Sequence, residues 1–111
     1  GGPNERGGPN ERGGPNAESG DPLLRAQILQ SAGRHREAIA FYRNAMASGA
    51  DPGECHQGIA LCHQRMGEAD AARDAYRKAI VAYEKQRNTA RWRAAEKGLT
   101  ACRAALEVLG E

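Results

Sequence analysis

The sequence repeats itself at an interval of 34 residues, and this repeat constrains the fold more than any other feature. Within each copy an alanine, a tyrosine and a second alanine follow one another at spacings of four and then three residues, which places them on one helical face. Periods of this length are typical of arrays in which each unit buries its apolar face on its neighbours. The matching pairs are Gly33 and Gly67, Ala38 and Ala72, Tyr42 and Tyr76, and Ala45 and Ala79.

Signals for the beginning and the end of helices divide the chain further. Asp21-Pro22 and Asp51-Pro52 each combine a capping aspartate with a proline at the first helical position, where no backbone donor is needed. Glycine readily adopts the left-handed conformation that ends many helices. It stands at three places where the helical pattern should end, at Gly33, Gly49 and Gly67.

These signals predict five helices in a chain rich in Ala, Leu, Arg and Glu. The break near Asn88-Thr89 carries the weakest signal, so the fourth and fifth helices could also form one long rod. The expected helices cover residues 22–32, 35–48, 52–66, 69–87 and 89–109.

The period and the small–aromatic–small pattern resemble the tetratricopeptide repeat family, whose units are helix–turn–helix hairpins of 34 residues. The resemblance covers residues 19–87 well and 88–109 loosely. It implies an all-α fold, a short right-handed solenoid with units at about 19–52 and 53–87. A proline that usually ends a unit is missing at Glu84, and residues 89–109 would form a third unit's first helix or a capping helix.

The last predicted helix carries an apolar stripe with helical spacing. We expect this stripe to cover the exposed side of the second unit, since a bare array of two units would be marginally stable. Trp92 is its largest member and would bury on the order of 200 Å². The stripe consists of Trp92, Ala95, Leu99, Cys102, Leu106 and Leu109.

The N-terminal residues 1–20 form a separate segment that begins with a repeated hexapeptide, Gly-Gly-Pro-Asn-Glu-Arg. The repeated part contains no apolar side chain larger than proline, so it cannot offset the entropy lost on ordering, roughly 1–2 kcal/mol per residue. We therefore expect a disordered linker, either native or engineered, followed by one helical domain at 21–111. The alternative is a tethered peptide that folds back into the domain's own groove.

Charge and cysteine content indicate which partners and which cellular compartment to expect for this chain. The 16 basic and 14 acidic residues give a formal charge of +2, too near neutral to indicate a nucleic-acid or membrane-surface protein by itself. No segment approaches the roughly 18 apolar residues of a membrane span, so no membrane partner is expected. Three cysteines, an odd number, argue against a disulfide framework and favour the reducing cytoplasm.

Two Cys-His pairs, Cys55-His56 and Cys62-His63, could suggest a zinc site. Residues seven apart on a helix share a face but lie about 10.5 Å apart along its axis, too far to share one metal ion. We therefore expect structural thiols, and His63 packed in the core. Since the chain also lacks a glycine-rich phosphate loop that follows a strand, we predict no enzymatic activity, no cofactor and no metal.

The resemblance to tetratricopeptide repeats implies a concave groove, lined by the first helix of each unit, that accepts a peptide of a partner protein. The last helix could enter this groove with Arg91, Trp92 and Ala95, or with Arg93, Lys97 and Thr100. The function expected is that of a non-catalytic adaptor. Its candidate peptide-binding residues are Gln27, Gln30, Gln57, Leu61, Gln64, Arg65, Arg93 and Lys97.

Two other functions stay open from the sequence. Residues 73–103 contain nine basic and three acidic side chains, which could attract nucleic acid or an acidic protein partner. Nucleic acid is the less favoured of these, because few aromatic side chains interleave with the basic ones. Alternatively, the exposed ends of the array could stack between chains and produce self-association.

Overall fold

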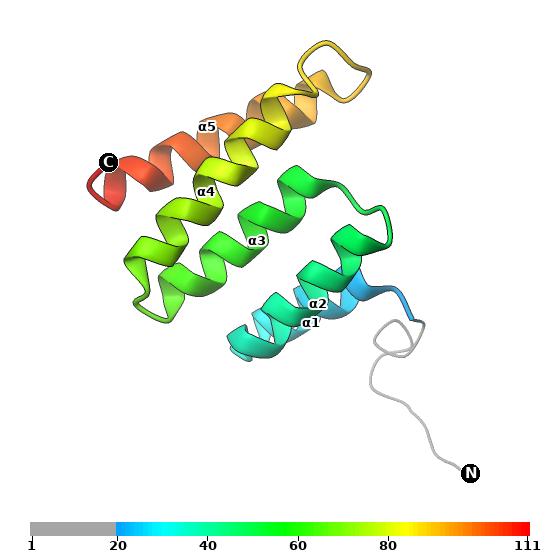
Figure 1. Ribbon diagram of the computed structural model, residues 1–111, viewed down its shortest axis with the longest axis vertical. Coiled ribbons are helices and arrows are strands. Elements are labelled where there is room, and N and C mark those ends of the chain that lie inside the picture. Colours follow the sequence, from blue (N-terminus) through cyan, green and yellow to red (C-terminus); the bar gives the residue numbers. More distant parts are fainter. Residues whose placement is uncertain (1–19) are drawn as a thin grey trace, which may run out of the picture.

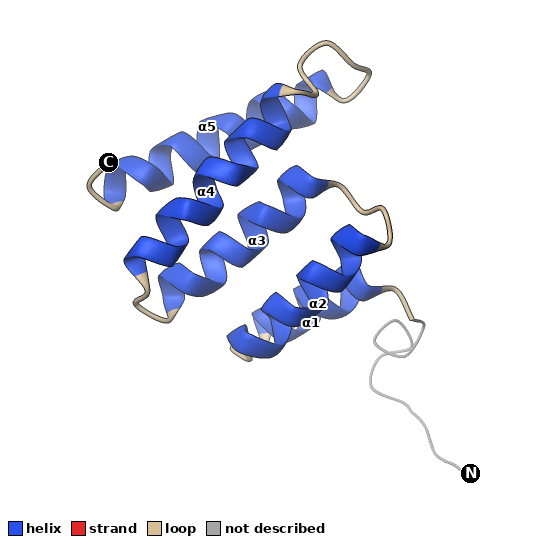
Figure 2. Ribbon diagram, in the orientation of Figure 1, coloured by secondary structure: helices blue, strands red, loops and turns tan. Residues whose placement is uncertain are grey.

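The computed structural model describes residues 20–111, so the predicted linker at 1–20 lies, apart from Gly20, outside the described residues. Figure 1 and Figure 2 show a fold built from helices, and the described part contains no strand. The predicted all-α fold is confirmed, and each helix end falls within three residues of its expected position. The helices are α1 (Pro22–Ser31), α2 (His35–Ala47), α3 (Pro52–Arg65), α4 (Ala69–Glu84) and α5 (Trp92–Val108).

The caps act as the sequence predicts. A side-chain oxygen of Asp21 accepts a hydrogen bond from the N–H of Leu23 at 3.1 Å. The carboxylate of Asp51 accepts one from the N–H of Glu54 at 2.9 Å, so α1 and α3 begin in the same way. The three glycines that end helices have φ of 81°, 97° and 79°, at Gly33, Gly49 and Gly67 respectively.

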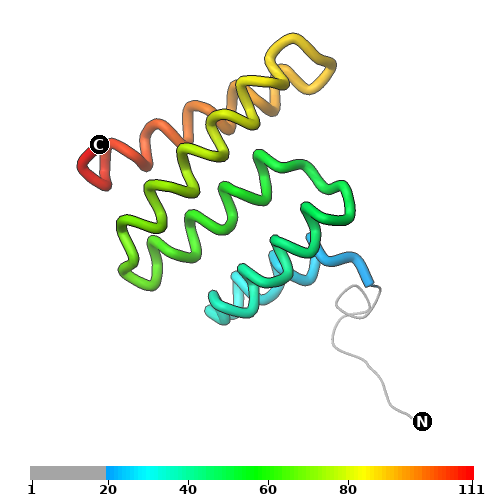
Figure 3. Tube along the Cα trace, viewed as in Figure 1, coloured from blue at the N-terminus to red at the C-terminus, as the bar shows by residue number. Residues whose placement is uncertain are grey.

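The helices form two layers. α3 lies between α2 and α4, as the traces in Figure 1 and Figure 3 show, while α1 packs on α2 and α5 packs on α4. Both α1 and α5 also approach α3, whereas α2 and α4 do not approach each other within residues 20–111. The first layer is therefore α1, α3 and α5, and the second layer is α2 and α4.

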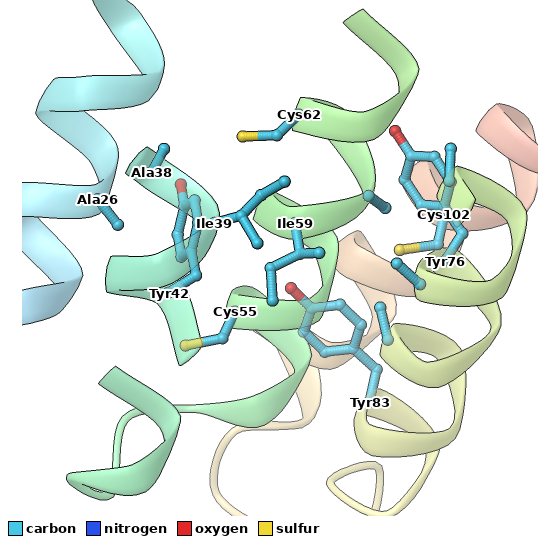
Figure 4. Packing of buried hydrophobic residues seen from close by; sticks show 14 of the residues in the cluster. Ala26, Ala38, Ile39, Tyr42, Cys55, Ile59, Cys62, Tyr76, Tyr83 and Cys102 are labelled. Carbon is cyan, nitrogen blue, oxygen red and sulfur yellow. The ribbon is translucent and has the colours of Figure 1, made fainter. Parts of the chain in front are cut away.

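Tyr42 and Tyr76 occupy equivalent places in the two units. Their side chains are buried, with residue exposures of 3% and 4%, and Figure 4 shows both rings inside the cluster of apolar side chains. The hydroxyl of Tyr42 donates to the amide oxygen of Gln30. The hydroxyl of Tyr76 donates to the amide oxygen of Gln64 at 2.7 Å. Because each glutamine precedes its tyrosine by 12 residues, the 34-residue repeat extends to these hydrogen bonds.

A third tyrosine, Tyr83 of α4, has no counterpart in the first unit. It joins α4 to α3 and α5. Its ring fills the space over Gly53 of α3 and Gly98 of α5, where a β-carbon would lie 2.6 Å and 2.4 Å from ring atoms. Its hydroxyl donates to the amide oxygen of Gln57 at 2.6 Å. Tyr83 therefore fixes α5 on the second unit, and the two glycines permit the close approach.

The expected burial of Trp92 is wrong, because 48% of this residue is exposed. Trp92 is the first residue of α5, beside the segment 85–91 in which the chain turns away from α4 (Figure 1). The guanidinium of Arg93 lies 5.0 Å from the centroid of its ring. The remainder of the predicted stripe faces the core, with Ala95, Leu99 and Cys102 fully buried and Leu106 and Leu109 packed against them.

The sequence contains three tyrosines, and all three are buried in the fold. Their burial predicts how the stability of the fold changes at alkaline pH. Desolvation raises the pKa of Tyr42 from 10.0 to about 12, and burial raises the pKa of Tyr76 and Tyr83 as well. The folded chain thus keeps phenol protons that the unfolded chain loses near pH 10. The stability linked to these protons is present below pH 10 and is lost as the pH rises towards about 12.

We expect the absorbance of phenolate at 295 nm to appear only as the helical circular dichroism is lost. A titration that follows both signals on one sample measures this. Complete ionisation with a midpoint near pH 10, while the helical signal persists, would contradict the burial of these rings.

Candidate functional site

A hollow of about 390 Å³ lies between α3 and α5, in the first layer of helices. On the α5 side the hollow is lined by the small residues Ala94, Gly98 and Ala101. Part of the lining is the ring of Tyr83, which reaches between the two helices from α4. The complete lining is Asp51, Glu54, Gln57, Tyr83, Arg91, Ala94, Lys97, Gly98 and Ala101.

The two sides of this hollow carry opposite charges. Asp51 and Glu54 stand at the N-terminal end of α3, while Arg91 and Lys97 face them from the α5 side. One guanidinium nitrogen of Arg91 lies 3.9 Å from a carboxylate oxygen of Asp51. The amide of Gln27 in α1 donates to the carboxylate of Glu54 at 3.3 Å, so this polar surface continues from α5 through α3 to α1.

Three glutamines of the first layer are held by tyrosine hydroxyls. The amide oxygens of Gln30, Gln57 and Gln64 accept the hydrogen bonds of Tyr42, Tyr83 and Tyr76, respectively. A glutamine amide has two N–H donors on its nitrogen as well as the oxygen acceptor. Among residues 20–111 the Nε2 atoms of these glutamines have no acceptor. The tyrosines thus orient the amides and leave their N–H groups available.

The predicted site residues fall into three groups. Gln57 and Lys97 line the hollow, and Gln27 is joined to it through its hydrogen bond to Glu54. Gln30 and Gln64 belong to the first layer but lie outside the hollow, each bound to a tyrosine.

The other predicted residues lie farther from the hollow. Leu61 is half-buried on α3, and Arg65 is exposed in the last turn of the same helix. Arg93 does not line the hollow, because it stacks on Trp92. The structure therefore combines the two registers considered for the last helix, since Arg91 comes from one and Lys97 from the other.

The small residues of α5 line the hollow, a feature that the sequence did not predict. Gly98 in the middle of α5 was the available signal, because an interior glycine lowers helix stability by roughly 0.5–1 kcal/mol and often marks a close approach. The approach is that of the Tyr83 ring. Ala94 and Ala101 gave no comparable signal, since alanine favours a helix wherever it stands.

The basic stretch at 73–103 is largely neutralised by acidic neighbours. Six of its nine basic side chains, which stand on α4, on α5 and in the segment between them, form ion pairs. The exceptions are Lys85, Arg93 and Lys97, for which the described residues supply no acidic partner. The pairs are Arg73 with Asp70, Arg77 with Glu111, Lys78 with Asp74, Arg87 with Glu96, Arg91 with Asp51, and Arg103 with Glu84.

His63, expected to pack in the core, has a side chain that is 14% exposed and contacts Glu68, which in turn binds the first unit. Its Nδ1 lies 2.7 Å from one carboxylate oxygen of Glu68, and Arg36 of the first unit binds the other oxygen. The hydrogen bond from His63, followed by that from Arg36, lowers the pKa of the Glu68 carboxyl. This cluster is thus an inter-unit contact that keeps Glu68 charged.

The three cysteines are free and fully buried. Burial raises the pKa of both Cys55 and Cys102 to about 11, so these thiols stay protonated at neutral pH. Protonated, inaccessible thiols are poor nucleophiles and poor metal ligands. In the described part of the chain, no three His, Cys, Asp or Glu side chains come together as a metal site.

Comparison with known proteins agrees with the observed hairpins. The family model described as tetratricopeptide repeat matches residues 23–48 and 53–86, more than half of the chain. These two matches coincide with the pair α1 and α2 and the pair α3 and α4. No curated protein and no solved structure gives a significant match.

Across residues 20–111, none of the helices combines the length and apolar character that crossing a membrane requires. Repeats of the matched kind indicate a module for protein–protein interaction. The stacked hairpins, their equivalent tyrosines and the two family matches show that the chain belongs to the tetratricopeptide repeat family.

Proposed function

We propose that the layer formed by α1, α3 and α5 binds a peptide segment of a partner protein and that the chain acts as a non-catalytic adaptor. The observation that supports this most strongly is the set of tyrosine-held glutamines, Gln30, Gln57 and Gln64. A peptide backbone presents carbonyl acceptors, and fixed amide donors meet them with little loss of side-chain entropy.

The opposite charges of the hollow would set the direction of the bound segment. A basic side chain of the partner would lie near Asp51 and Glu54, and an acidic one near Arg91 and Lys97. Complementary charges of this kind fix the register of a complex and speed encounter more than they add affinity. The hollow of about 390 Å³ has room for one side chain of the partner.

The cysteines and the ion pairs of the basic stretch bear on where the chain acts and on what kind of partner it binds. The three free cysteines favour a reducing, intracellular location. Nucleic acid is the weaker alternative partner, because ion pairs already occupy most of the basic stretch 73–103. A protein partner therefore suits the observed surface better.

The proposal is tested with peptides selected from a random display library on the wild-type chain. Lys97→Glu reverses one charge of the hollow at an exposed position, so the fold should persist while the Kd of the selected peptides rises at least about fivefold. Fluorescence anisotropy measures the Kd, and circular dichroism checks the helical content.

Arg103→Glu is the matched control, because Arg103 is exposed on α5 and lines neither the α3–α5 hollow nor the hollows on the other side of α3. Gln64 is less suitable for this test, since its replacement also removes the partner of the Tyr76 hydroxyl. Selected peptides that bind the Lys97→Glu and wild-type chains equally well would refute binding at this layer.

A further inference from the structure

A second groove lies on the other side of α3, between α2 and α4. One hollow of about 330 Å³ is lined by residues of α2, α3 and α4, and an adjoining hollow of about 490 Å³ continues along α4. The two hollows share the residues His56, Asp74 and Lys78. We call this continuous surface the α2–α4 groove.

The helical positions on α3 separate this groove from the proposed peptide-binding layer. Glu54 and Gln57 line the α3–α5 hollow, while His56 and Ile59 line the α2–α4 groove. Each α-helical residue advances by about 100°, so these two pairs face widely different directions. A ligand in one groove leaves the other groove open.

The larger hollow of the α2–α4 groove is apolar. Pro52, Val81 and Ala82 contribute to its lining, and 53% of Val81 is exposed. Val81 is one of few large apolar residues that the fold leaves uncovered within residues 20–111, and it lines the larger hollow of this groove. Burial of such a side chain by a partner would remove apolar area from water.

Positive charge surrounds this apolar strip. Arg77, Lys78 and Lys85 line the larger hollow and Arg43 lines the smaller one, whereas Asp74 is the one acidic side chain in either lining. Within the described residues, Arg43 and Lys85 have no acidic partner, whereas Arg77 is paired with Glu111, which does not line the groove. The pair of Lys78 with Asp74, at 3.2 Å, is exposed at both ends and contributes little stability, so Lys78 is free to meet another carboxylate.

We propose that the α2–α4 groove docks an acidic amphipathic segment of a partner protein, with an apolar side chain on Val81 and carboxylates at Lys78 and Lys85. The charge of the groove favours an acidic occupant, and its apolar strip favours a protein segment over nucleic acid. No Phe, Tyr or Trp lines either hollow, so the groove offers no aromatic ring on which a base could stack. The chain would then hold two protein segments at once, one on each side of α3.

The test uses the full chain and a synthetic fluorescein-labelled peptide of 14 residues. The peptide carries Leu at alternating spacings of three and four and Glu elsewhere, so that its helix has an apolar face and an acidic face. We expect Val81→Glu and Lys85→Glu to weaken its binding at least tenfold in fluorescence anisotropy. Added salt should weaken binding to the wild-type chain, because the charged groups are exposed.

Matched variants separate this groove from other surfaces. Val108→Glu makes the same change at an apolar residue that is 77% exposed and outside both hollows, and Lys97→Glu reverses a charge in the α3–α5 hollow. Both should keep the Kd within twofold of wild type. A peptide with Lys in place of Glu should not bind. Amide shifts in ¹H–¹⁵N spectra should concentrate on α4 near Val81.

Three results would overturn the proposal. The first is equal weakening by Val81→Glu and Val108→Glu, and the second is a set of amide shifts concentrated around Gln57 and Lys97. The third is single-stranded RNA that binds in competition with the peptide, loses affinity with Lys85→Glu and is insensitive to Val81→Glu. Since the Lys97→Glu variant reports on the α3–α5 hollow alone, failure here is distinct from failure of the function proposed above.

Discussion

Replacing Tyr83 with Ala is expected to lower the free energy of unfolding by about 4 kcal/mol, the range seen when a buried aromatic side chain is removed. The ring lies between Gly53 and Gly98, neither of which has a side chain that could fill the space left behind. A small domain has only about 5–15 kcal/mol of stability in total. Chemical denaturation followed by circular dichroism should therefore show a large shift of the midpoint.

Two control variants identify the cause of this loss. Tyr83→Phe keeps the ring and removes only its hydrogen bond to Gln57, so we expect a loss of about 1 kcal/mol. Trp92→Ala removes an aromatic ring larger than that of Tyr83. The expected loss of unfolding free energy is nevertheless below about 1 kcal/mol, because Trp92 is half exposed and its ring stacks with Arg93. Equal losses for Tyr83→Ala and Trp92→Ala would contradict the role of Tyr83 in holding α5.

Replacing Gly58 with Val is expected to lower stability by about 2–3 kcal/mol through overpacking between the two units. A β-carbon at Gly58 of α3 would lie 2.3 Å from the end of the Tyr42 ring of α2. The ring is buried and its hydroxyl is bound to Gln30, so it has little freedom to move aside. The midpoint of denaturation measures this loss directly.

A double-mutant cycle shows whether the contact with Tyr42 causes the loss. Tyr42→Leu shortens the side chain that meets Gly58, so Gly58→Val should cost far less in that background. Helix propensity alone favours Val over Gly, by a few tenths of a kcal/mol. If Gly58→Val costs the same with Tyr42 and with Leu at that position, steric contact is not the reason for glycine there.

Much of the fold follows from local signals in the sequence. Asp21 and Asp51 cap the helices that they were expected to begin, and Gly33 and Gly67 have the positive φ predicted for helix ends. These features depend on a few neighbouring residues, so the sequence around each is sufficient to predict them. The 34-residue period added the long-range part, because units with the same pattern of small and aromatic residues stack in the same way.

The candidate site was less predictable. Gln30 and Gln64 follow from the repeat, whereas Gln57 has no equivalent in the first unit, and the orientation of all three depends on tyrosine hydroxyls 12 or 26 residues later in the sequence. The register of the last helix, in which residues of both alternatives line the hollow, depended on the length of the segment 85–91, which follows no repeat. Arg93 and Trp92 therefore lie elsewhere than in the α3–α5 hollow.

The sequence by itself determined that this chain forms stacked helical hairpins, because caps, helix ends and the repeat are encoded by residue types at fixed spacings. Only the tertiary structure decided which aromatic residue attaches α5, and where grooves lie on either side of α3. Tyr83 is buried instead of Trp92 because its ring meets glycines on two other helices, Gly53 and Gly98. Such a fit requires the close approach of three segments that are far apart in sequence. The pattern of residues within any one segment therefore cannot predict it.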